Sequence, residues 1–211
     1  MIGVQALVLA TRNHGKAREF ARLLGDAFRV DLVPDAVVLP EESGRTFAEN
    51  ARLKAETVFS ALGGVMAVLA DDSGLEVAAL SGRPGVLSAR YAGERARDED
   101  NVTRLLADLN GRADREARFV CGLCLVLAPE RAGRGAEPRI IEVRGVAEGT
   151  IAEAPRGTAG FGYDPVFQPG GWEETLAEAS PERKDQVSHR GAAVKALLAC
   201  LRNEGSSGHG A

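Results

Sequence analysis

Short β-like runs alternate with helical patterns along the chain, and this alternation constrains the possible folds more than any other feature. Gln5–Ala10 and Val65–Ala70 are typical strand segments, and the second is wholly apolar, as strands buried on both faces are. Thr46–Leu62 lies between them and carries its apolar residues on one helical stripe. Strands that alternate with helices predict an α/β layer fold.

The second half of the chain adds two longer strand patterns, Arg118–Ala128 and Arg139–Ile151. The loop between them, Pro129–Pro138, is rich in Arg, Gly and Pro, so the two strands can form a hairpin. Because a hairpin joins antiparallel strands, the sheet is expected to be mixed rather than all-parallel. Further helices are predicted at Lys16–Leu24, Asp98–Leu109 and Ser188–Arg202.

Length and composition exclude several classes of protein. A chain of 211 residues is expected to form one domain or one two-lobed domain, here 1–203, followed by a disordered tail at 204–211. The net charge of −4 and the aromatic content of 5% argue against a nucleic-acid-binding module, which needs a basic face. No apolar run approaches the roughly 18 residues of a membrane span, so we expect a cytoplasmic protein without a membrane partner.

The three cysteines form an odd, sparse set, which is typical of reduced thiols rather than of a disulfide framework. Cys121 and Cys124 have the spacing of a C-x-x-C motif, but they lie inside a predicted strand. An odd separation there points the two side chains to opposite faces. We therefore predict that both are core residues and not zinc or redox ligands.

Two acidic features suggest a site for a hard cation. Asp71 and Asp72 directly follow Val65–Ala70 and precede a glycine, so we place them at the carboxyl end of a strand, where α/β sites form. Adjacent carboxylates repel each other, and Mg²⁺ would relieve that repulsion, although one Asp could simply cap the turn. Glu49 lies three residues after Thr46 and is interpreted first as half of a helix capping box, a position that also suits a cation.

Three further segments offer groups suited to an anionic nucleotide. Thr11–Lys16 joins a strand to a helix, and its N–H groups and lysine could cradle a phosphate, although an ordinary polar turn is the favoured interpretation of this segment taken alone. Two glycines flank Phe161 within Gly160–Pro165, where the ring could stack on a base or the segment could be a structural turn. Lys184 and Ser188–Arg190 gather donors near the start of the last helix, where an anion or a carbonyl would offset their charge.

Taken in order, these segments resemble the inosine/xanthosine triphosphate pyrophosphatase family, also called non-canonical purine NTP pyrophosphatases. Each motif is weak singly, but the ordered set is specific and runs from residue 9 to residue 190. Leu87 and Asp185 stand where the family usually has Tyr and Asn, outside the catalytic positions. The matching stretches are 9–16 (LATRNHGK), 46–51 (TFAENA), 70–75 (ADDSGL), 84–91 (PGVLSARY), 160–165 (GFGYDP) and 188–190 (SHR).

The resemblance implies an elongated α/β fold with a long mixed sheet, two lobes, a nucleotide cleft between them and a homodimer. It also implies Mg²⁺-dependent hydrolysis of a nucleoside triphosphate between the α- and β-phosphates, which gives a monophosphate and pyrophosphate. The implied substrates are deaminated purine nucleotides (ITP, dITP, XTP and dXTP), so the implied role is to cleanse the nucleotide pool.

The same resemblance assigns roles to single residues. Glu49 and Asp72 would hold Mg²⁺, and Asp72 would also be the general base. As a separate physical hypothesis, we expect Asp71 to support the metal, and Lys16 and Lys184 to stabilise the departing pyrophosphate. Substrate contacts are implied for Thr11, Arg12, Asn13, His14, Gly15, Lys16, Ser73, Phe161, Gly162, Tyr163, Asp164, Lys184, His189 and Arg190.

Two alternative functions stay open on the sequence alone. One is a related pyrophosphatase that acts on modified pyrimidine or methylated nucleotides. The other is a nucleotide sensor that binds without hydrolysis, against which the intact acid set of Glu49, Asp71 and Asp72 argues. Pyrophosphate release from a panel of triphosphates, with and without Mg²⁺, would separate these functions.

Overall fold

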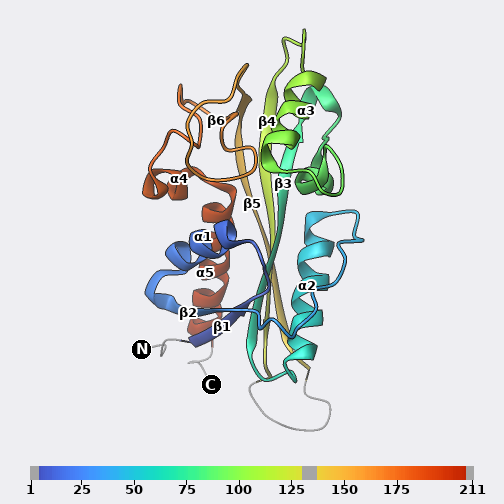
Figure 1. Cartoon of the computed structure of the whole chain (residues 1–211). Coiled ribbons are helices and arrows are strands. Elements are labelled where there is room, and N and C mark those ends of the chain that lie inside the picture. Colours follow the sequence, from blue (N-terminus) through green and yellow to red (C-terminus); the bar gives the residue numbers. More distant parts are fainter. Residues whose placement is uncertain (1–4, 130–136, 208–211) are drawn as a thin grey trace. The chain divides into compact units, whose positions relative to one another are not determined.

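The computed structural model describes residues 5–129 and 137–207, which form a mixed sheet flanked by helices (Figure 1). The six strands of the sheet follow the order β2-β1-β3-β4-β5-β6. The strands are β1 (Gln5–Leu9), β2 (Phe28–Leu32), β3 (Ala67–Val77), β4 (Glu116–Leu127), β5 (Arg139–Ile151) and β6 (Phe167–Pro169). The helices are α1 (His14–Leu24), α2 (Phe47–Ala61), α3 (Asp98–Asp108), α4 (Pro181–Val187) and α5 (His189–Ser207), with 3-10 turns at Gly25–Ala27, Ala78–Leu80 and Gly85–Arg90. The predicted α/β class is confirmed.

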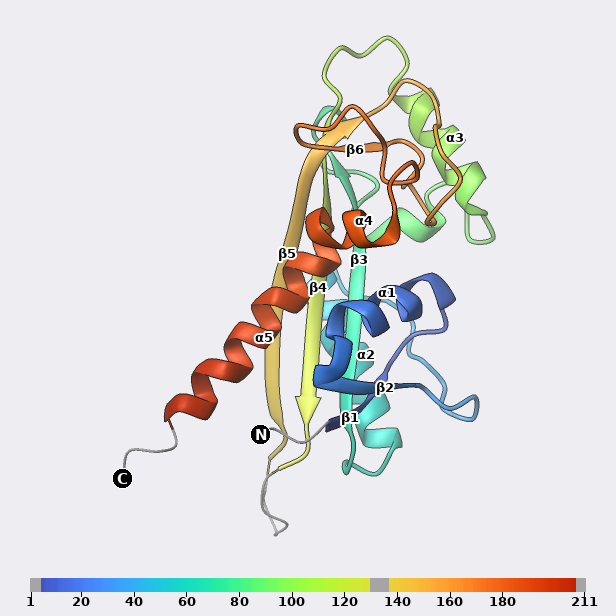
Figure 2. The same ribbon diagram turned by 90° about the vertical axis from the view of Figure 1, so that its left-hand side faces the viewer.

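The strand directions make the sheet mixed. β1 pairs in parallel with β2 and with β3, whereas β5 pairs antiparallel with β6. The neighbouring strands β4 and β5 also point in opposite directions (Figure 2), as the expected hairpin requires. Residues 130–136 of the predicted hairpin loop lie outside the described residues.

The chain divides into two compact units. The first unit contains residues 1–72, 122–145 and 193–211, and the second contains 73–121 and 146–192. The three long strands contribute residues to both, so neither unit is a continuous segment of chain. This arrangement explains why no linker stands out in the sequence.

Each unit has its own hydrophobic core. In the first unit, α2 covers one face of the sheet and α1 and α5 cover the other (Figure 1). Ala55 of α2 packs there in a cluster with Val68 of β3 and Val126 of β4. In the second unit, Leu105 of α3 belongs to a cluster with Phe167 of β6.

The bounds of β3 correct one prediction. Asp71 and Asp72 do not end a strand, because β3 continues through them to Val77. Leu75 and Val77 are fully buried in the core of the second unit, and this burial keeps the chain extended past the two acids. The polar sequence around Gly74 hides this continuation, since it has the composition of a turn.

The other element bounds follow the expected pattern closely, apart from the shortest elements. α2 begins after Thr46, and β5 has the predicted limits. β2, β6 and α4 have only five, three and seven residues, too few for a periodic pattern to stand out. α5 extends to Ser207, beyond the predicted helix end at Arg202 and into the tail expected at 204–211, of which residues 208–211 lie outside the described residues.

Cys121 and Cys124 lie in β4 and are both buried, which confirms the prediction that they are core residues. Burial raises the pKa of the Cys124 thiol to about 12. At pH 8 about one Cys124 in ten thousand would then be a thiolate, the reactive form.

We expect an aromatic disulfide reagent to titrate one thiol quickly in the folded chain, the half-buried Cys200, and all three after denaturation. Rapid reaction of two or three thiols in the folded chain would contradict a core role for Cys121 and Cys124.

No helix within residues 5–129 and 137–207 has the length and hydrophobicity needed to cross a membrane.

Candidate active site

The turn after β1 places Lys16 beside Asp71. β1 ends at Leu9, opposite Leu69 of β3, so the turn leaves the sheet where β3 continues into its two acids. The Lys16 ammonium lies 2.8 Å from Asp71 Oδ2, and the Asp71 side chain is 1% exposed. The ion pair therefore joins two predicted site residues that are 55 positions apart in sequence, and it keeps a cation at the start of α1.

The rest of the turn is shaped by its own side chains. Asn13 is the N-cap of α1, and its Oδ1 accepts a hydrogen bond of 3.0 Å from the Lys16 N–H. The Thr11 hydroxyl accepts one of 3.1 Å from the Asn13 N–H. The Asn13 cap is of the kind that starts a helix, the Thr11 contact shapes the turn before it, and His14 and Gly15 are the first helical residues.

The Arg12 side chain contacts the segment that follows β2. Its guanidinium donates to the carbonyl oxygens of Val33, Pro34 and Val37 at 2.7, 2.9 and 2.9 Å. It also forms an exposed ion pair with Asp35. The structure thus gives Arg12 a role in fastening the segment after β2, in addition to the substrate contact that the resemblance implies.

Asp72 is buried among polar partners supplied by α2. Its Oδ2 accepts a hydrogen bond of 2.9 Å from Asn50 Nδ2, and its Oδ1 lies 3.9 Å from Lys54 Nζ. Burial raises the pKa of Asp72, although Lys54 acts in the opposite direction. Burial also opposes the charge of Lys54, but the carboxylates around it outweigh burial and raise the pKa of its ammonium. Lys54 therefore stays positively charged beside a carboxylate of increased basicity.

Local packing explains why α2 brings these groups to Asp72. The Thr46 hydroxyl accepts from the Glu49 N–H at 3.1 Å and so fixes the start of the helix. In β4, a Cβ at Gly122 would lie only 2.8 Å from the backbone of Phe47 and Ala48, so glycine allows the helix start to approach the strand. Asn50 Oδ1 also accepts from the Gly44 N–H at 2.7 Å, which ties the preceding loop to the helix.

Glu49 and Glu42 differ in what their carboxylates contact. Glu49 is exposed, and its Oε2 accepts from the Arg45 N–H at 2.7 Å, one residue before the N-cap position of a capping box. Glu42 Oε1 lies 2.5 Å from Lys54 Nζ. Since Lys54 also approaches Asp72, Glu42 is the glutamate that the structure brings to the same cation as Asp72.

The donor set fits a hard cation that keeps most of its coordination for other ligands. Asp72 and Glu42 offer carboxylate oxygens, which Mg²⁺ prefers, and both carboxylates lie beside the Lys54 ammonium. Among the described residues no group of three or more His, Cys, Asp and Glu side chains is arranged to hold a metal. A divalent ion bound by two carboxylates would therefore complete its octahedron with phosphate and water oxygens.

In the second unit, Asp164 accepts the hydrogen bonds that shape the loop of residues 160–165 (the Phe161 loop). Asp164 Oδ2 accepts from the Phe161 N–H at 2.8 Å and from Lys184 Nζ at 2.5 Å. Gly160 has a φ of 78°, and a Cβ there would collide with the Asp164 carboxylate, so glycine is required. The Tyr163 hydroxyl donates to the Ser88 carbonyl at 2.9 Å, and burial raises the pKa of Tyr163.

Two cations flank the Phe161 ring. Lys184 Nζ lies 5.1 Å from the ring centroid and Arg190 Cζ lies 5.0 Å from it, within the range of cation–π interactions. Arg190 also donates to the Ser73 hydroxyl at 2.7 Å. His189 is buried and stacks on the Phe119 ring, with centroids 4.7 Å apart. The structure thus places Lys184 and Arg190 against the Phe161 ring and Ser73 beside Arg190. The ring contact of His189 is with Phe119.

A short helix that the sequence pattern does not predict lies just before the last helix. Lys184 belongs to the separate short helix α4, which ends at Val187. Ser188 then caps α5, because its hydroxyl accepts from the Gly191 N–H at 3.0 Å. His189 and Arg190 are the first two residues of α5, whose first turn has no acidic residue. The positive end of the helix and the Arg190 charge together favour an anionic or carbonyl ligand.

Asn50, Lys54 and Glu42 are site residues that the sequence pattern does not single out. A signal exists for two of them, since Asn50 and Lys54 lie next to Ala51 and Ala55 on the buried stripe of α2. Polar residues on a core-facing stripe are costly unless they have partners, so they indicate a buried network. Lys54 is also one of only four lysines in the chain.

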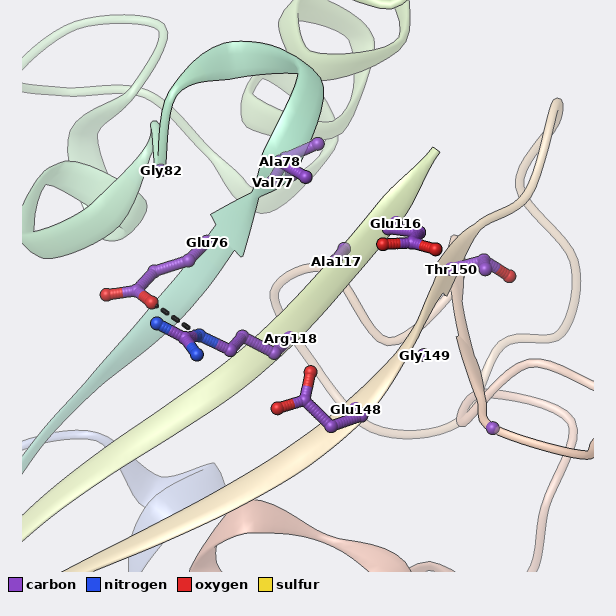
Figure 3. Close-up of a pocket in the computed structure, with 11 residues that line it drawn as sticks. Glu76, Val77, Ala78, Gly82, Glu116, Ala117, Arg118, Glu148, Gly149 and Thr150 are labelled. Atoms are coloured by element: carbon purple, nitrogen blue, oxygen red, sulfur yellow. Dashed lines mark hydrogen bonds and ion pairs between the residues drawn. The ribbon is translucent and has the colours of Figure 1, made fainter. Parts of the chain in front are cut away.

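A hollow of about 610 Å³ in the second unit contains none of the predicted site residues (Figure 3). Arg118 of β4 points toward Glu76 of β3, with Nε 2.7 Å from the carboxylate, and Glu148 of β5 lies on the other side of it (Figure 3). Glu116 adds a third acid to the lining. This excess of negative charge does not suit a polyphosphate.

The fold and the two sets of side chains define an α/β protein with buried acid–lysine pairs and an aromatic loop between cations. The chain matches the Ham1 family model over residues 7–200, and it belongs to this family.

Several relatives are similar over nearly their whole length. The dITP/XTP pyrophosphatase of Bacillus licheniformis is 45% identical over 203 residues, which cover 94% of this chain and 98% of that protein. The dITP/XTP pyrophosphatase of Staphylococcus aureus is 42% identical over 204 residues, with coverages of 95% and 98%. Two solved structures, the Ham1 protein of Staphylococcus aureus and a HAM1 protein from Coxiella burnetii, give TM-scores of 0.77 and 0.79 at 40% and 39% identity, and each match covers 95% of this chain and 100% of the other.

Proposed function

We propose that the protein hydrolyses non-canonical purine nucleoside triphosphates (dITP, ITP, XTP and dXTP) to the monophosphate and pyrophosphate and so cleanses the nucleotide pool. The observation that carries the proposal is the 45% identity to a dITP/XTP pyrophosphatase over 94% of the chain. The buried Asp72–Lys54 and Asp71–Lys16 pairs support it, because phosphoryl chemistry requires carboxylates for a metal and cations for phosphate.

The first unit supplies the groups for the phosphates and the attacking water. The Asp72 carboxylate, held by Asn50 and close to Lys54, would accept the proton of that water. Lys16 and Lys54 would neutralise negative charge on the phosphates, and Asp71 would hold Lys16 in place. Mg²⁺ bound through Asp72 would neutralise the triphosphate and lower the pKa of a bound water.

Groups suited to a purine base, together with one further cation for phosphate, lie within the second unit. Phe161 offers an apolar ring, while Arg190 and His189 offer donors for a 6-oxo purine. Lys184 lies against Asp164 and would add a positive charge for the leaving pyrophosphate.

The decisive experiment measures pyrophosphate and orthophosphate released from ITP, dITP, XTP, GTP, ATP, dUTP and a methylated purine triphosphate, with Mg²⁺ and with EDTA. We expect pyrophosphate from ITP, dITP and XTP in Mg²⁺ alone. Orthophosphate with a diphosphate would show that another bond is cleaved. Preference for dUTP or the methylated nucleotide would favour the related pyrophosphatase, and binding without release would favour a sensor.

We also propose a cytoplasmic homodimer without a nucleic-acid or membrane partner. The support is the family resemblance together with the net charge of −4, which does not favour a polyanionic surface as partner. Light scattering of the purified chain, with and without ITP, tests the dimer.

The two candidate metal glutamates make different predictions. Glu42→Gln should raise the Mg²⁺ concentration needed for half-maximal activity by about tenfold, because Glu42 and Asp72 both lie beside Lys54 and the variant removes one of these two carboxylates that would hold the ion. Glu49→Gln should change this requirement less than about twofold, because its carboxylate contacts the Arg45 N–H. Titration of both variants with Mg²⁺ at saturating ITP measures the difference.

The opposite result, a large rise for Glu49→Gln and none for Glu42→Gln, would assign the metal to Glu49 and Asp72 as the sequence predicts. Thermal melts of both variants separate a loss of metal affinity from a loss of stability.

A further inference from the structure

The Phe161 loop is fastened from outside by a residue that neither the sequence motifs nor the proposed chemistry uses. Asp98, the first residue of α3, accepts a hydrogen bond of 2.6 Å from the Gly162 N–H through its Oδ2. The two residues are 64 positions apart in sequence. This contact therefore fixes the middle of the loop to a helix that is itself anchored in the core of the second unit.

The loop conformation needs such an anchor. Gly160 and Gly162 have φ values of 78° and 61°, a backbone that glycine adopts freely but does not keep by itself. The other bond to a carboxylate, from Phe161 to Asp164, lies within the loop and closes it on itself. Asp98 supplies the hydrogen bond that holds the tip between these glycines to another element.

The same end of α3 also holds the segment on which the loop rests. Asn101 accepts from the Ala92 N–H at 2.8 Å and donates to the Ala89 carbonyl at 3.1 Å. Tyr163, the residue after Gly162, donates to the Ser88 carbonyl in that segment. The first turn of α3 thus fastens both the loop and its support.

We propose that Asp98 is a positioning residue for the nucleotide: it holds Gly162 so that the Phe161 ring stays between Lys184 and Arg190 before substrate arrives. A binding-competent loop that is already populated lowers the conformational cost of binding, so the effect belongs mainly to KM and little to kcat. This inference rests on the proposed function, because the loop matters only if a nucleotide binds there.

The competing explanation is that Asp98 only stabilises α3. Carboxylates in the first turn of a helix interact favourably with its positive end, and Glu99 and Asp100 also lie in that turn. Asn at position 98 would keep an oxygen acceptor for Gly162 but lose the charge. Gln at position 99 would lose an equal charge from an exposed side chain and leave the Gly162 contact intact.

The experiment compares Asp98→Ala, Asp98→Asn and Glu99→Gln with the wild type in full-length protein. We expect Asp98→Ala to raise KM for ITP by about fivefold or more, since the variant removes the acceptor of the Gly162 N–H, with kcat within about twofold. Hydrogen exchange of a peptide that spans residues 160–164 should become faster in this variant. Asp98→Asn and Glu99→Gln should stay near the wild type in both measurements.

Equal KM and exchange in Asp98→Ala and the wild type would overturn the proposal. A common defect in Asp98→Ala, Asp98→Asn and Glu99→Gln would overturn it as well, in favour of helix charge. If Asp98→Ala does not fold, Asp98→Ser keeps a residue favoured at helix starts and takes its place. A wild-type chain that releases no pyrophosphate refutes the proposed function instead, while the exchange measurement still decides the contact of Asp98 with the loop.

Discussion

Asp72→Asn is expected to lower kcat for ITP by about a thousandfold while the chain stays folded. General-base catalysis alone contributes about 10² to 10⁴ in rate, and the same carboxylate would hold the metal. The amide keeps the size of the side chain, and its oxygen can still accept the hydrogen bond from Asn50. It cannot take a proton from water, and as a neutral ligand it binds a divalent cation more weakly than a carboxylate does. Initial rates of pyrophosphate release at saturating Mg²⁺ measure the loss.

Glu76→Gln is the matched control, because Glu76 lies on the same strand but its carboxylate binds Arg118 outside the candidate site. This variant should keep its rate within about twofold, since an exposed ion pair contributes little. Circular dichroism and thermal melts of both variants test the fold. An Asp72→Asn enzyme that keeps a tenth of the wild-type rate would show that another group is the base.

Elements with a long periodic pattern could be predicted from the sequence closely. α2 has a capping threonine and an apolar stripe over four turns, and β5 has thirteen residues, so local signals determine both of them. β6 has no such signal: it exists because its three residues pair with β5 at Gly149–Ile151. Pairing of this kind depends on distant residues, which a local pattern does not contain.

The candidate site also contains some residues that a local sequence pattern predicts and others that it does not. Lys16, Asp71 and Asp72 could be predicted because their motifs lie where a strand pattern stops. Lys54 and Glu42 could not, because their role follows from packing: α2 must approach β4 before its buried face meets Asp72. The position of the two acids in mid-strand depends on the core of the second unit.

Asp98 is a residue whose proposed role toward the loop no sequence motif predicts. Its position at the start of α3 follows from the sequence, and a carboxylate there is explained fully by helix stability. Only the hydrogen bond to Gly162 gives it a second role. Local rules that are satisfied can therefore conceal a functional contact.

Arg190→Ala is expected to lower the ratio of kcat/KM for ITP to that for ATP by about tenfold. Arginine is donor-only at any ordinary pH, so a buried Arg190 suits the 6-oxo group of inosine and opposes the amino group of adenine. A buried donor left without an acceptor costs about 1–3 kcal/mol, which corresponds to about fivefold to 160-fold discrimination. The ratio of ITP to GTP should change less, because guanine also has a 6-oxo group.

The control for this prediction is Arg183→Ala, which removes another arginine that lies over an aromatic ring, at 4.0 Å from the Trp172 centroid and outside the Phe161 loop. It should leave both ratios within about twofold of the wild type, as exposed cation–π pairs contribute little. Competition between ITP and ATP in one reaction gives the ratio directly. An equal loss of rate on ITP, GTP and ATP in Arg190→Ala would identify Arg190 as a phosphate ligand, because the phosphates are common to all three nucleotides and the base is not.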